Sequence, residues 1–195
     1  MQLKNLKTNF LGRNFIYYNE IDSTQAEIWR RVNNGTDLSF IKDGTLVMAD
    51  IQTKGKGTHG RTWYTDEKNN IAFSLFAQMN CNIKKIEGIT IEIAQIINKV
   101  FKTKYGIDLK IKEPNDIMYN NKKIGGILTE SKVISEQVKY LVIGIGLNTS
   151  KVEFADEIKD IATSIKKEFN IDINPKEFIA DFCNEFEKKI IRRKK

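Results

Sequence analysis

The sequence predicts an α+β fold in which a mixed β-sheet packs against helices. Three observations support this prediction. Short runs of β-branched and aromatic residues recur along the chain, helical segments are interspersed with them in mixed order, and one pair of runs has the form of a hairpin. No linker or repeat divides the chain, so residues 1–195 are expected to form a single domain.

The first half of the chain carries start and stop signals for helices. Asp22, Ser23 and Thr24 offer capping side chains before the first helix, and Asn-Asn-Gly at residues 33–35 ends it. Gly106 follows the second helix, in which isoleucines recur at helical spacing. Strands are expected over residues 15–21, 45–51 and 71–79, and helices over residues 26–32 and 85–104.

The second half is expected to contribute a hairpin and two closing helices. Pro114 breaks a short strand, and the Asn-Asn-Lys turn at residues 120–122 joins the two arms of the hairpin. Asn174, Pro175 and Glu177 resemble a capping box at the start of the last helix. Strands are expected over residues 109–112, 117–119, 123–130 and 138–145, and helices over residues 158–169 and from 174 onward. The last helix places Phe178, Phe182, Phe186 and Ile190 on one face.

The composition is that of an ordinary globular protein, with 41% apolar and 29% charged residues. The formal net charge of +7 fits either an anionic partner or lysines spread over a solvated surface. Cys81 and Cys183 lie far apart without CxxC spacing, which indicates neither a disulfide framework nor a zinc site; Cys183 is expected in the core. The polar N-terminus and the short apolar runs favour a soluble, cytoplasmic protein.

The glycine-rich segment Gly-Lys-Gly-Thr-His-Gly-Arg-Thr-Trp at residues 55–63 is the first candidate for chemistry. Its glycines allow backbone N–H groups to approach an anion, and Lys56 and Arg61 add charge for a phosphate or carboxylate. The spacing matches neither a Walker A loop nor a dinucleotide fingerprint, and a flexible turn is the alternative. His59 has no partner with metal-ligand spacing, so it is expected to be an exposed loop residue.

Three further segments carry candidate residues. Lys112 stands at a strand end beside a rigid proline turn, where an ammonium group could neutralise phosphate charge; the alternative is a surface lysine. Gly125 and Gly126 lie within a strand, which is typical of a bulge or of close approach to a ligand. The strand end at residues 143–148 combines small residues with Asn148, and its alternative is a plain tight turn.

Together and in this order, these segments resemble the catalytic domain of biotin protein ligases (biotin–acetyl-CoA-carboxylase ligases). The resemblance covers nearly the whole chain and implies a fold of the class II aminoacyl-tRNA synthetase and biotin ligase type. The family's Gly-Arg-Gly-x-x-Gly-Arg-x-Trp, Lys-Trp-Pro-Asn-Asp, Lys-x-x-Gly-Ile-Leu-x-Glu, Gly-x-Gly-x-Asn and Asp-Ser-Thr-Asn motifs correspond to residues 55–63, 112–116, 123–130, 144–148 and 22–25.

The resemblance implies roles for individual residues. Lys112 would hold the biotin carboxylate and the adenylate as the main catalytic residue, assisted by Arg61. The residues expected to bind biotin and its adenylate are Ser23, Thr24, Gln25, Gln52, Gly55, Lys56, Gly57, Thr58, Gly60, Lys112, Gly125 and Gly126. Those expected to contact the nucleotide are Lys56, Lys123 and Asn148. No residues are assigned to a metal held by the protein alone.

The implied reaction is the ATP-dependent biotinylation of a lysine on a biotin carboxyl carrier protein. The biotin carboxylate would attack the α-phosphate of ATP, forming biotinyl-5'-AMP and releasing pyrophosphate, and the acceptor amine would then attack the acyl carbon. Both steps depend on positioning and charge neutralisation rather than on a covalent enzyme intermediate. Mg²⁺ is expected to bridge the phosphates.

The sequence departs from the family pattern in four places. Glu113 replaces a tryptophan, and Thr58 stands where many members carry arginine, which predicts faster leakage of the adenylate. No helix-turn-helix segment fits before residue 16, so DNA binding is not expected despite the positive charge. The family's small C-terminal β domain is missing, so either the chain is naturally short or a longer one is truncated.

Two rival functions and the oligomeric state stay open. One rival is a lipoate or octanoate ligase, and the other is a degenerate biotin-binding module without ligase activity. The expected partners are a carboxylase's biotin carboxyl carrier domain, biotin and ATP, without DNA or membrane. The protein is expected to be a monomer or a homodimer, in which an edge strand over residues 138–145 could pair between subunits.

Overall fold

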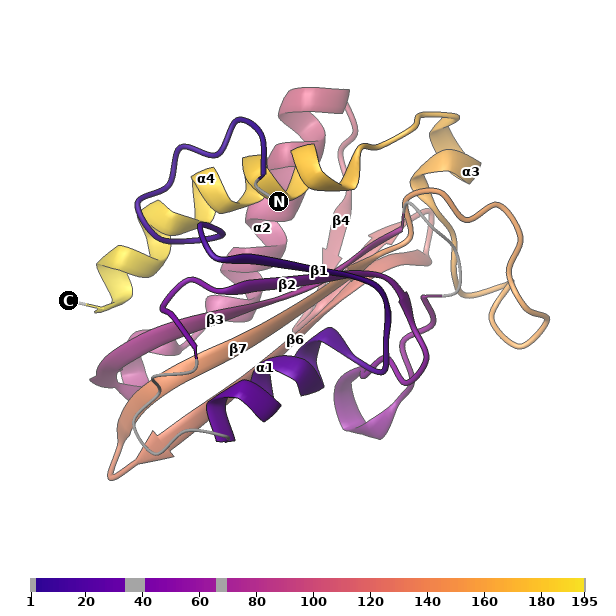
Figure 1. Ribbon diagram of the computed structural model, residues 1–195. Coiled ribbons are helices and arrows are strands. Elements are labelled where there is room, and N and C mark those ends of the chain that lie inside the picture. The colour runs from indigo at the N-terminus through magenta and orange to yellow at the C-terminus, as the bar shows by residue number, and fades with distance from the viewer. Residues whose placement is uncertain (1–2, 34–40, 66–69, 195) are drawn as a thin grey trace.

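The computed structural model describes residues 3–33, 41–65 and 70–194. It confirms the α+β prediction, since helices pack on a mixed seven-stranded sheet (Figure 1). The strands are β1 (Phe15–Ile21), β2 (Leu46–Gln52), β3 (Ile71–Asn82), β4 (Lys110–Lys112), β5 (Asp116–Tyr119), β6 (Lys122–Ile134) and β7 (Gln137–Leu147). The helices are α1 (Thr24–Asn33), α2 (Ile89–Tyr105), α3 (Ile165–Phe169) and α4 (Pro175–Lys194), with 3-10 turns at Thr58–Gly60 and Ile83–Ile86.

The sheet has the strand order β1-β2-β3-β7-β6-β5-β4. Only the β1–β2 pair is parallel, and each of the other neighbouring pairs is antiparallel. The expected hairpin is present as β5 and β6. β7 lies between β3 and β6, so the expectation of an edge strand over residues 138–145 is wrong. That run is strongly apolar because both of its edges and both of its faces are covered.

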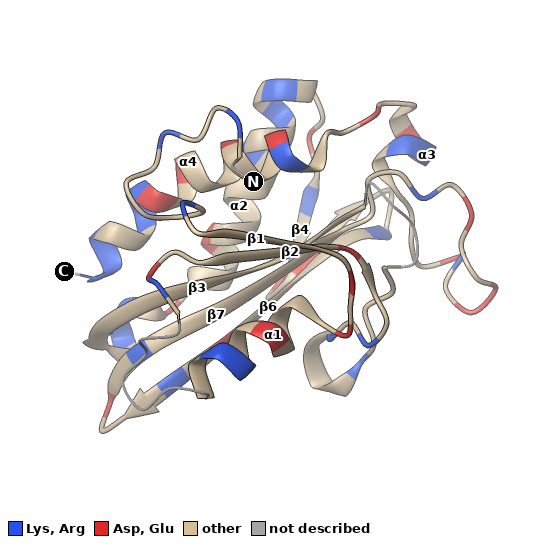
Figure 2. Cartoon of the chain, viewed as in Figure 1, with Lys and Arg blue, Asp and Glu red and all other residues tan. Residues whose placement is uncertain are grey.

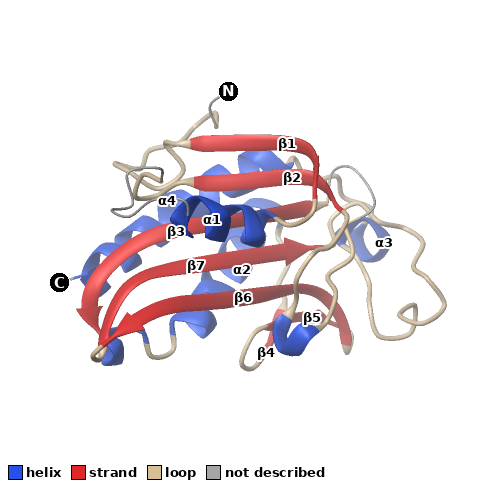
Figure 3. Cartoon of the chain, turned by 60° about the horizontal axis from the view of Figure 1, so that its bottom comes forward, coloured by secondary structure: helices blue, strands red, loops and turns tan. Residues whose placement is uncertain are grey.

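The two faces of the sheet carry separate apolar cores. α2 and α4 cover one face, whereas α1 crosses the other (Figures 1 and 3). The larger core lies under α2 and α4, where Phe178, Phe182, Phe186 and Ile190 are fully buried as predicted. Cys183 is buried beside them, also as predicted. The smaller core joins α1 to β2, β3 and β7, and it contains Ile28, Val32, Val47, Phe76, Tyr140 and Val142.

The helix ends follow local signals. Asn174 caps α4, because its Oδ1 accepts hydrogen bonds from the backbone N–H groups of Lys176 and Glu177. Gly106 ends α2 in the left-handed conformation with φ of 70°. The predicted end of α1 at residues 34–35 lies outside the described residues.

The helix predicted over residues 158–169 is wrong in its first half, since α3 begins only at Ile165. Residues 161–163 are instead held against the start of β6, where the N–H of Lys123 donates to the Ile161 carbonyl and the N–H of Thr163 to the Lys123 carbonyl. Ser164 then caps α3 by accepting from the N–H of Lys167. Pairing with a distant strand therefore overrides the helical spacing of the apolar residues.

Charged residues of both signs occur along α1 and α4 (Figure 2). Many are paired, as in the ion pairs of Lys104 with Glu177 and Asp181 between α2 and α4. Such surface ion pairs fit the expectation that many of the lysines and arginines behind the net positive charge lie on a solvated surface. Within the described ranges, no helix is long and apolar enough to cross a membrane.

Candidate active site

A cavity of about 240 Å³ lies on the α1 face of the sheet, beyond the smaller core. On this face Phe76 of β3 and Val142 of β7 fill the space beneath α1. Farther along the same strands the positions that point to this face are Ser74, Gly144 and Gly146, all of which line the cavity. Since side chains alternate between the faces of a strand, the change from large to small residues opens the cavity.

The floor of the cavity consists of polar side chains from β2, β3 and the start of α1 with the residue just before it: Ser23, Thr24, Gln25, Gln52 and Ser74. The backbone N–H and the hydroxyl of Thr24 lie 2.9 and 3.1 Å from Gln52 Oε1. The Thr24 hydroxyl lies 2.8 Å from Ser74 Oγ. These bonds join the start of α1 to the end of β2 and to the first half of β3, and the floor carries no formal charge.

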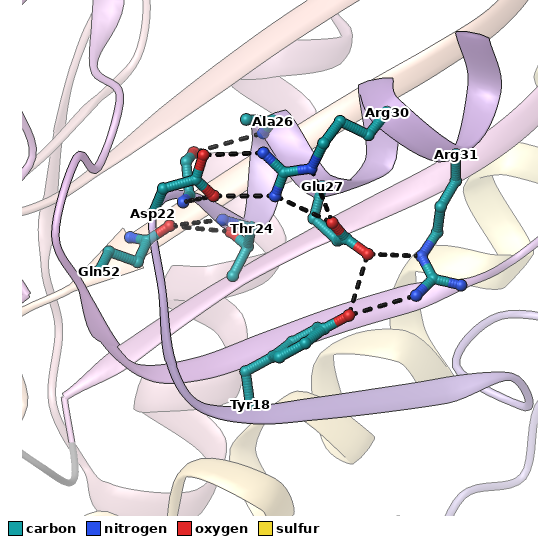
Figure 4. Close-up of polar contacts among 9 residues, drawn as sticks. Tyr18, Asp22, Thr24, Ala26, Glu27, Arg30, Arg31 and Gln52 are labelled. Atoms are coloured by element: carbon teal, nitrogen blue, oxygen red, sulfur yellow. Dashed lines mark hydrogen bonds and ion pairs between the residues drawn. The ribbon is translucent and has the colours of Figure 1, made fainter. Parts of the chain in front are cut away.

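An ion-pair network holds the turn before α1 in place (Figure 4). Arg30 donates to both carboxylate oxygens of Asp22, at 2.7 and 2.8 Å, and also pairs with Glu27. These hydrogen bonds from Arg30 lower the pKa of Asp22 to about 2. Asp22 in turn accepts from the N–H of Ser23 at 2.7 Å. The network therefore fixes the backbone that presents Ser23 and Thr24 to the cavity.

The mouth of the cavity is formed by residues 53–65 and 149–163, which are largely irregular. Two backbone hydrogen bonds close the first segment, from Gly57 N–H to the Arg61 carbonyl and from Trp63 N–H to the Gly55 carbonyl. The Gly57 and Trp63 N–H groups are thus committed to the loop itself, and anion binding by the remaining glycines of the loop stays a prediction. The charge of Lys56 and Arg61, whose side chains are exposed, stays available at the cavity.

Thr58 and Arg61 contact each other within this loop. Arg61 Nε donates to the Thr58 carbonyl at 3.1 Å, and its Nη2 donates to the Thr58 hydroxyl at 2.7 Å. Trp63 packs flat against β7, where a side chain at Gly146 would overlap the indole ring. The absence of a side chain at Gly146 thus leaves room for Trp63 to pack against β7 and hold the loop beside the cavity.

Two lysines that the sequence placed in neighbouring motifs have different surroundings. Lys123 lines the cavity, with Nζ 2.6 Å from Asp116 Oδ1 and 5.9 Å from the centroid of the Trp63 ring. Lys112 is exposed on β4, the outermost strand, and is not among the residues that line the cavity. Glu113, which stands where the family pattern has tryptophan, is also exposed and outside the lining. Of these two lysines, Lys123 is therefore the one that a ligand in the cavity would contact.

The segment over residues 149–163 adds an apolar side to the mouth. Phe154, Ile158 and Ile161 line the cavity there, and Ile161 is 62% exposed. The ammonium groups of Lys151 and Lys167 lie 5.8 and 5.6 Å from the centroid of the Phe154 ring. This side of the mouth combines apolar surface with nearby positive charge.

The structure brings together most of the residues predicted for the site. Those that line the cavity are Ser23, Thr24, Gln25, Gln52, Lys56, Gly57, Thr58, Arg61, Lys123, Gly126 and Asn148. Those outside the lining are Lys112, Gly55, Gly60 and Gly125. Gly125 has a packing explanation, since a Cβ there would overlap Leu147 of β7. His59 is exposed in the loop, as expected.

Sequence reasoning gave no role to several lining residues. Ser74 could have been noticed as a polar residue within an apolar strand, and Trp63 and Asn115 lie within motifs already singled out. The residues from Lys151 to Ala162 carry no such local signal, because their contribution depends on pairing with β6. Among the described residues, no group of three His, Cys, Asp or Glu side chains could hold a metal ion.

Comparison with known proteins identifies the family. Residues 17–148 match the sequence profile of the Biotin/lipoate A/B protein ligase family. The bifunctional ligase/repressor BirA of Bacillus spizizenii is 38% identical over 164 residues, covering 83% of this chain and 49% of that protein. The chain thus spans about half the length of this curated relative.

Solved structures agree with this assignment. The biotin protein ligase from Aquifex aeolicus in complex with biotin and ATP superposes with a TM-score of 0.70 at 28% identity, covering 93% of this chain and 70% of that one. The ligase from Leishmania major in complex with biotinyl-5-AMP gives a TM-score of 0.66 at 25% identity, covering 90% and 74%. The fold and the family profile lead to one conclusion: the chain belongs to the Biotin/lipoate A/B protein ligase family.

Proposed function

We propose that this chain joins biotin to ATP as biotinyl-5'-AMP and transfers the biotin to a lysine of a biotin carboxyl carrier domain. The observation that carries the proposal is the make-up of one cavity, which has an uncharged polar floor, Lys56 and Arg61 at its mouth, and Lys123 of β6 in its lining. Such a cavity suits a ligand with a neutral polar ring at one end and an anion at the other. The relatives named as biotin ligases support the same reaction.

In the first step a carboxylate oxygen of biotin attacks the α-phosphorus of ATP, and pyrophosphate leaves. Lys123 is the residue best placed to hold both anions together, because its ammonium faces the cavity and is oriented by Asp116. A fixed positive charge also stabilises the charge that builds up on the phosphorus. Arg61 and Lys56 would neutralise the remaining phosphate charge at the mouth.

In the second step the neutral amine of the acceptor lysine attacks the acyl carbon, and AMP leaves with the electrons of the broken acyl–oxygen bond. The amine loses a proton, so the product is an amide. The exposed apolar surface around Ile161 and Phe154 would cover the nucleotide and limit hydrolysis of the mixed anhydride.

Mg²⁺ would enter with ATP rather than occupy a site of its own. Mg²⁺ in such sites is commonly held by one or two carboxylates, the substrate phosphates and water. Asp116, which lies 2.6 Å from Lys123 Nζ just outside the cavity lining, is the carboxylate that would fit this pattern, and it also orients Lys123. A cytoplasmic location suits a reaction that consumes ATP and modifies a carboxylase.

The polar floor favours biotin over lipoate or octanoate, the substrates of the rival ligase. A dithiolane ring or an alkyl chain offers no hydrogen bond to the floor, so the buried Gln25 Oε1, which has no partner among the described residues, would be left unsatisfied. Discrimination of this kind is strong when a site is built to bind a polar group.

The test incubates the protein with ATP, Mg²⁺, biotin and a biotin carboxyl carrier domain, followed by mass spectrometry of the carrier. The expected result is a mass gain equal to one biotinyl group, absent without ATP and absent when lipoate or octanoate replaces biotin. Binding of biotin without any mass gain or pyrophosphate release would favour the degenerate biotin-binding module. Mass gain from lipoate instead would favour the lipoate ligase.

A further inference from the structure

Asn70 is a buried polar residue that the proposed reaction does not yet use. It is 3% exposed and lies directly before β3, outside the cavity lining. Its Oδ1 accepts hydrogen bonds from the N–H of Thr149 at 2.9 Å and from the N–H and the hydroxyl of Ser150 at 3.1 and 3.4 Å. One side-chain oxygen therefore holds the start of the segment over residues 149–163, which forms one side of the mouth.

The orientation of the Asn70 amide is determined by these partners. Backbone N–H groups can only donate, so the amide oxygen must face Thr149 and Ser150. The amide nitrogen, Nδ2, is then buried without a hydrogen-bond partner among the described residues. A buried donor without a partner is destabilising, so the stability of the fold alone does not account for an asparagine at this position.

The end of the same segment is held close by. The sheet register pairs Ile71 of β3 with Leu147 of β7, so Asn70 and Asn148 lie at adjacent strand ends. Asn148 Nδ2 donates to the Thr163 carbonyl at 3.2 Å. Both ends of the segment are thus fixed where β3 begins and β7 ends, as in an Ω-loop, whose ends lie close together.

The anchored start of the segment leads directly to a cation at the cavity. Lys151 follows Ser150, is 7% exposed and lines the cavity. Its ammonium lies 5.8 Å from the centroid of the Phe154 ring, which also lines the cavity. A charge stabilises a reacting phosphate when the surrounding structure fixes its position beforehand. The backbone that carries Lys151 is fixed one residue earlier, by the Asn70 oxygen.

We propose that Asn70 is a positioning residue for the nucleotide side of the cavity, which sets the placement of Lys151 and Phe154 through Thr149 and Ser150. The proposal rests on the proposed function, in which this side of the mouth covers the nucleotide. Asn70 acts through the segment and not on a reacting atom, because it lies outside the cavity lining. The hydrogen bonds that build the floor join other residues, so the biotin end of the cavity should not depend on Asn70.

The test is Asn70→Ala, which removes the acceptor oxygen. The KM for ATP in biotin-dependent pyrophosphate exchange should rise on the order of tenfold, because two backbone hydrogen bonds that orient the segment are lost. The affinity for biotin alone, measured by calorimetry without ATP, should be unchanged. A loss of folded protein would lower the amount of active enzyme without raising the KM, so this readout separates positioning from stability.

Two further variants sharpen the test. Asn70→Asp keeps an oxygen acceptor and replaces only the unpaired Nδ2, so it should restore the KM for ATP to near that of the unaltered protein. Asn98→Ala is the matched control, because Asn98 Oδ1 likewise accepts from a backbone N–H, that of Leu109 at 2.8 Å. Asn98 lies on α2, across the sheet from the cavity, so its loss should lower stability and leave the KM unchanged.

The outcomes separate this inference from the proposed function. An unchanged KM for ATP in folded Asn70→Ala overturns the inference, as does an equal rise in Asn98→Ala or in Asn70→Asp. Equal weakening of biotin and ATP would indicate a merely structural role and also overturns it. If Asn70→Ala does not fold, Asn70→Ser, whose oxygen falls short of both N–H groups, takes its place with the same expected result. Absence of exchange in the unaltered protein overturns the proposed function, and the inference with it.

Discussion

The floor of the cavity consists of side chains on α1, β2 and β3 that are held by hydrogen bonds, whereas the mouth consists of two largely irregular segments with exposed cations. Thr24 and Gln52 are hydrogen-bonded to each other without a bound ligand. The Arg61 side chain, in contrast, is exposed and hydrogen-bonds to Thr58 of its own loop. In the proposed reaction this difference would divide two roles, with the floor selecting the neutral ring and the mouth supplying positive charge for phosphate.

The largest effect on the proposed reaction is expected for a substitution of Lys123, the cation that lies between the floor and the mouth. Lys123→Ala should lower the rate of adenylate formation by about 100-fold or more, because a fixed charge at the reacting phosphate is removed. Biotin-dependent release of pyrophosphate measures this rate. Lys112→Ala is the matched control on the neighbouring hairpin, and its rate should stay near that of the unaltered protein. Equal losses in both variants would contradict the assignment of Lys123.

A smaller effect is expected at the mouth, at Thr58. Thr58→Arg adds a cation to the loop, so the dissociation of bound biotinyl-5'-AMP should slow by about twofold to fivefold, the range expected for an exposed ion pair. The measurement is the release rate of labelled adenylate after dilution. The affinity for biotin itself should be unchanged, because Thr58 lies outside the floor. Release at the same rate, or faster, would show that the loop gains nothing from the added charge.

The smallest effect is expected beneath the floor, at the Asp22–Arg30 pair. The folded-state pKa of Asp22, about 2, lies below the ordinary value of 3.8, so the pair stabilises the fold above about pH 4 and loses this contribution as the pH falls toward 2. Both side chains are more than a third exposed, at 39% and 45%, so solvent screening limits the contribution to below about 1 kcal/mol.

Asp22→Asn should therefore lower the free energy of unfolding slightly at about pH 6, and the deficit should shrink as the pH falls below about 4. Urea titrations at both pH values measure the deficit. Asp156→Asn, whose carboxylate is 89% exposed in an ion pair with Lys159, is the control and should change stability little. A loss of stability in Asp22→Asn that grows as the pH falls would contradict the predicted direction of the pH dependence.

The fold was largely predictable because its signals are local. The strand over residues 15–21 was predicted with its observed bounds, and Asn174 marked the start of α4. The segment over residues 158–164 was mispredicted as helix because its conformation depends on hydrogen bonds with Lys123 on a distant strand. The position of β7 could not be predicted either, since a buried central strand and a hydrophobic edge strand have similar sequences.

Most residues expected at the site line the cavity, but the sequence does not indicate which lysine lies there. Lys112 was expected to be the main catalytic residue and Lys123 a nucleotide contact, although each begins a recognisable motif. Their difference arises from sheet order, which places β4 at the edge and β6 next to β7. The sequence also could not predict that Gln25 Oε1 is unpaired, because the orientation of this amide depends on Glu130 and Val142, more than 100 positions away in the sequence. Sequence patterns thus identify the residues of a site, and tertiary contacts decide which atoms face the ligand.

The most direct test of the central claim is the biotin-dependent exchange of labelled pyrophosphate into ATP, which isolates the adenylation step from the acceptor. The account predicts exchange that requires Mg²⁺ and biotin, is retained in Lys112→Ala and is lost in Lys123→Ala. An absence of exchange in the unaltered, folded protein at saturating biotin and ATP would contradict it.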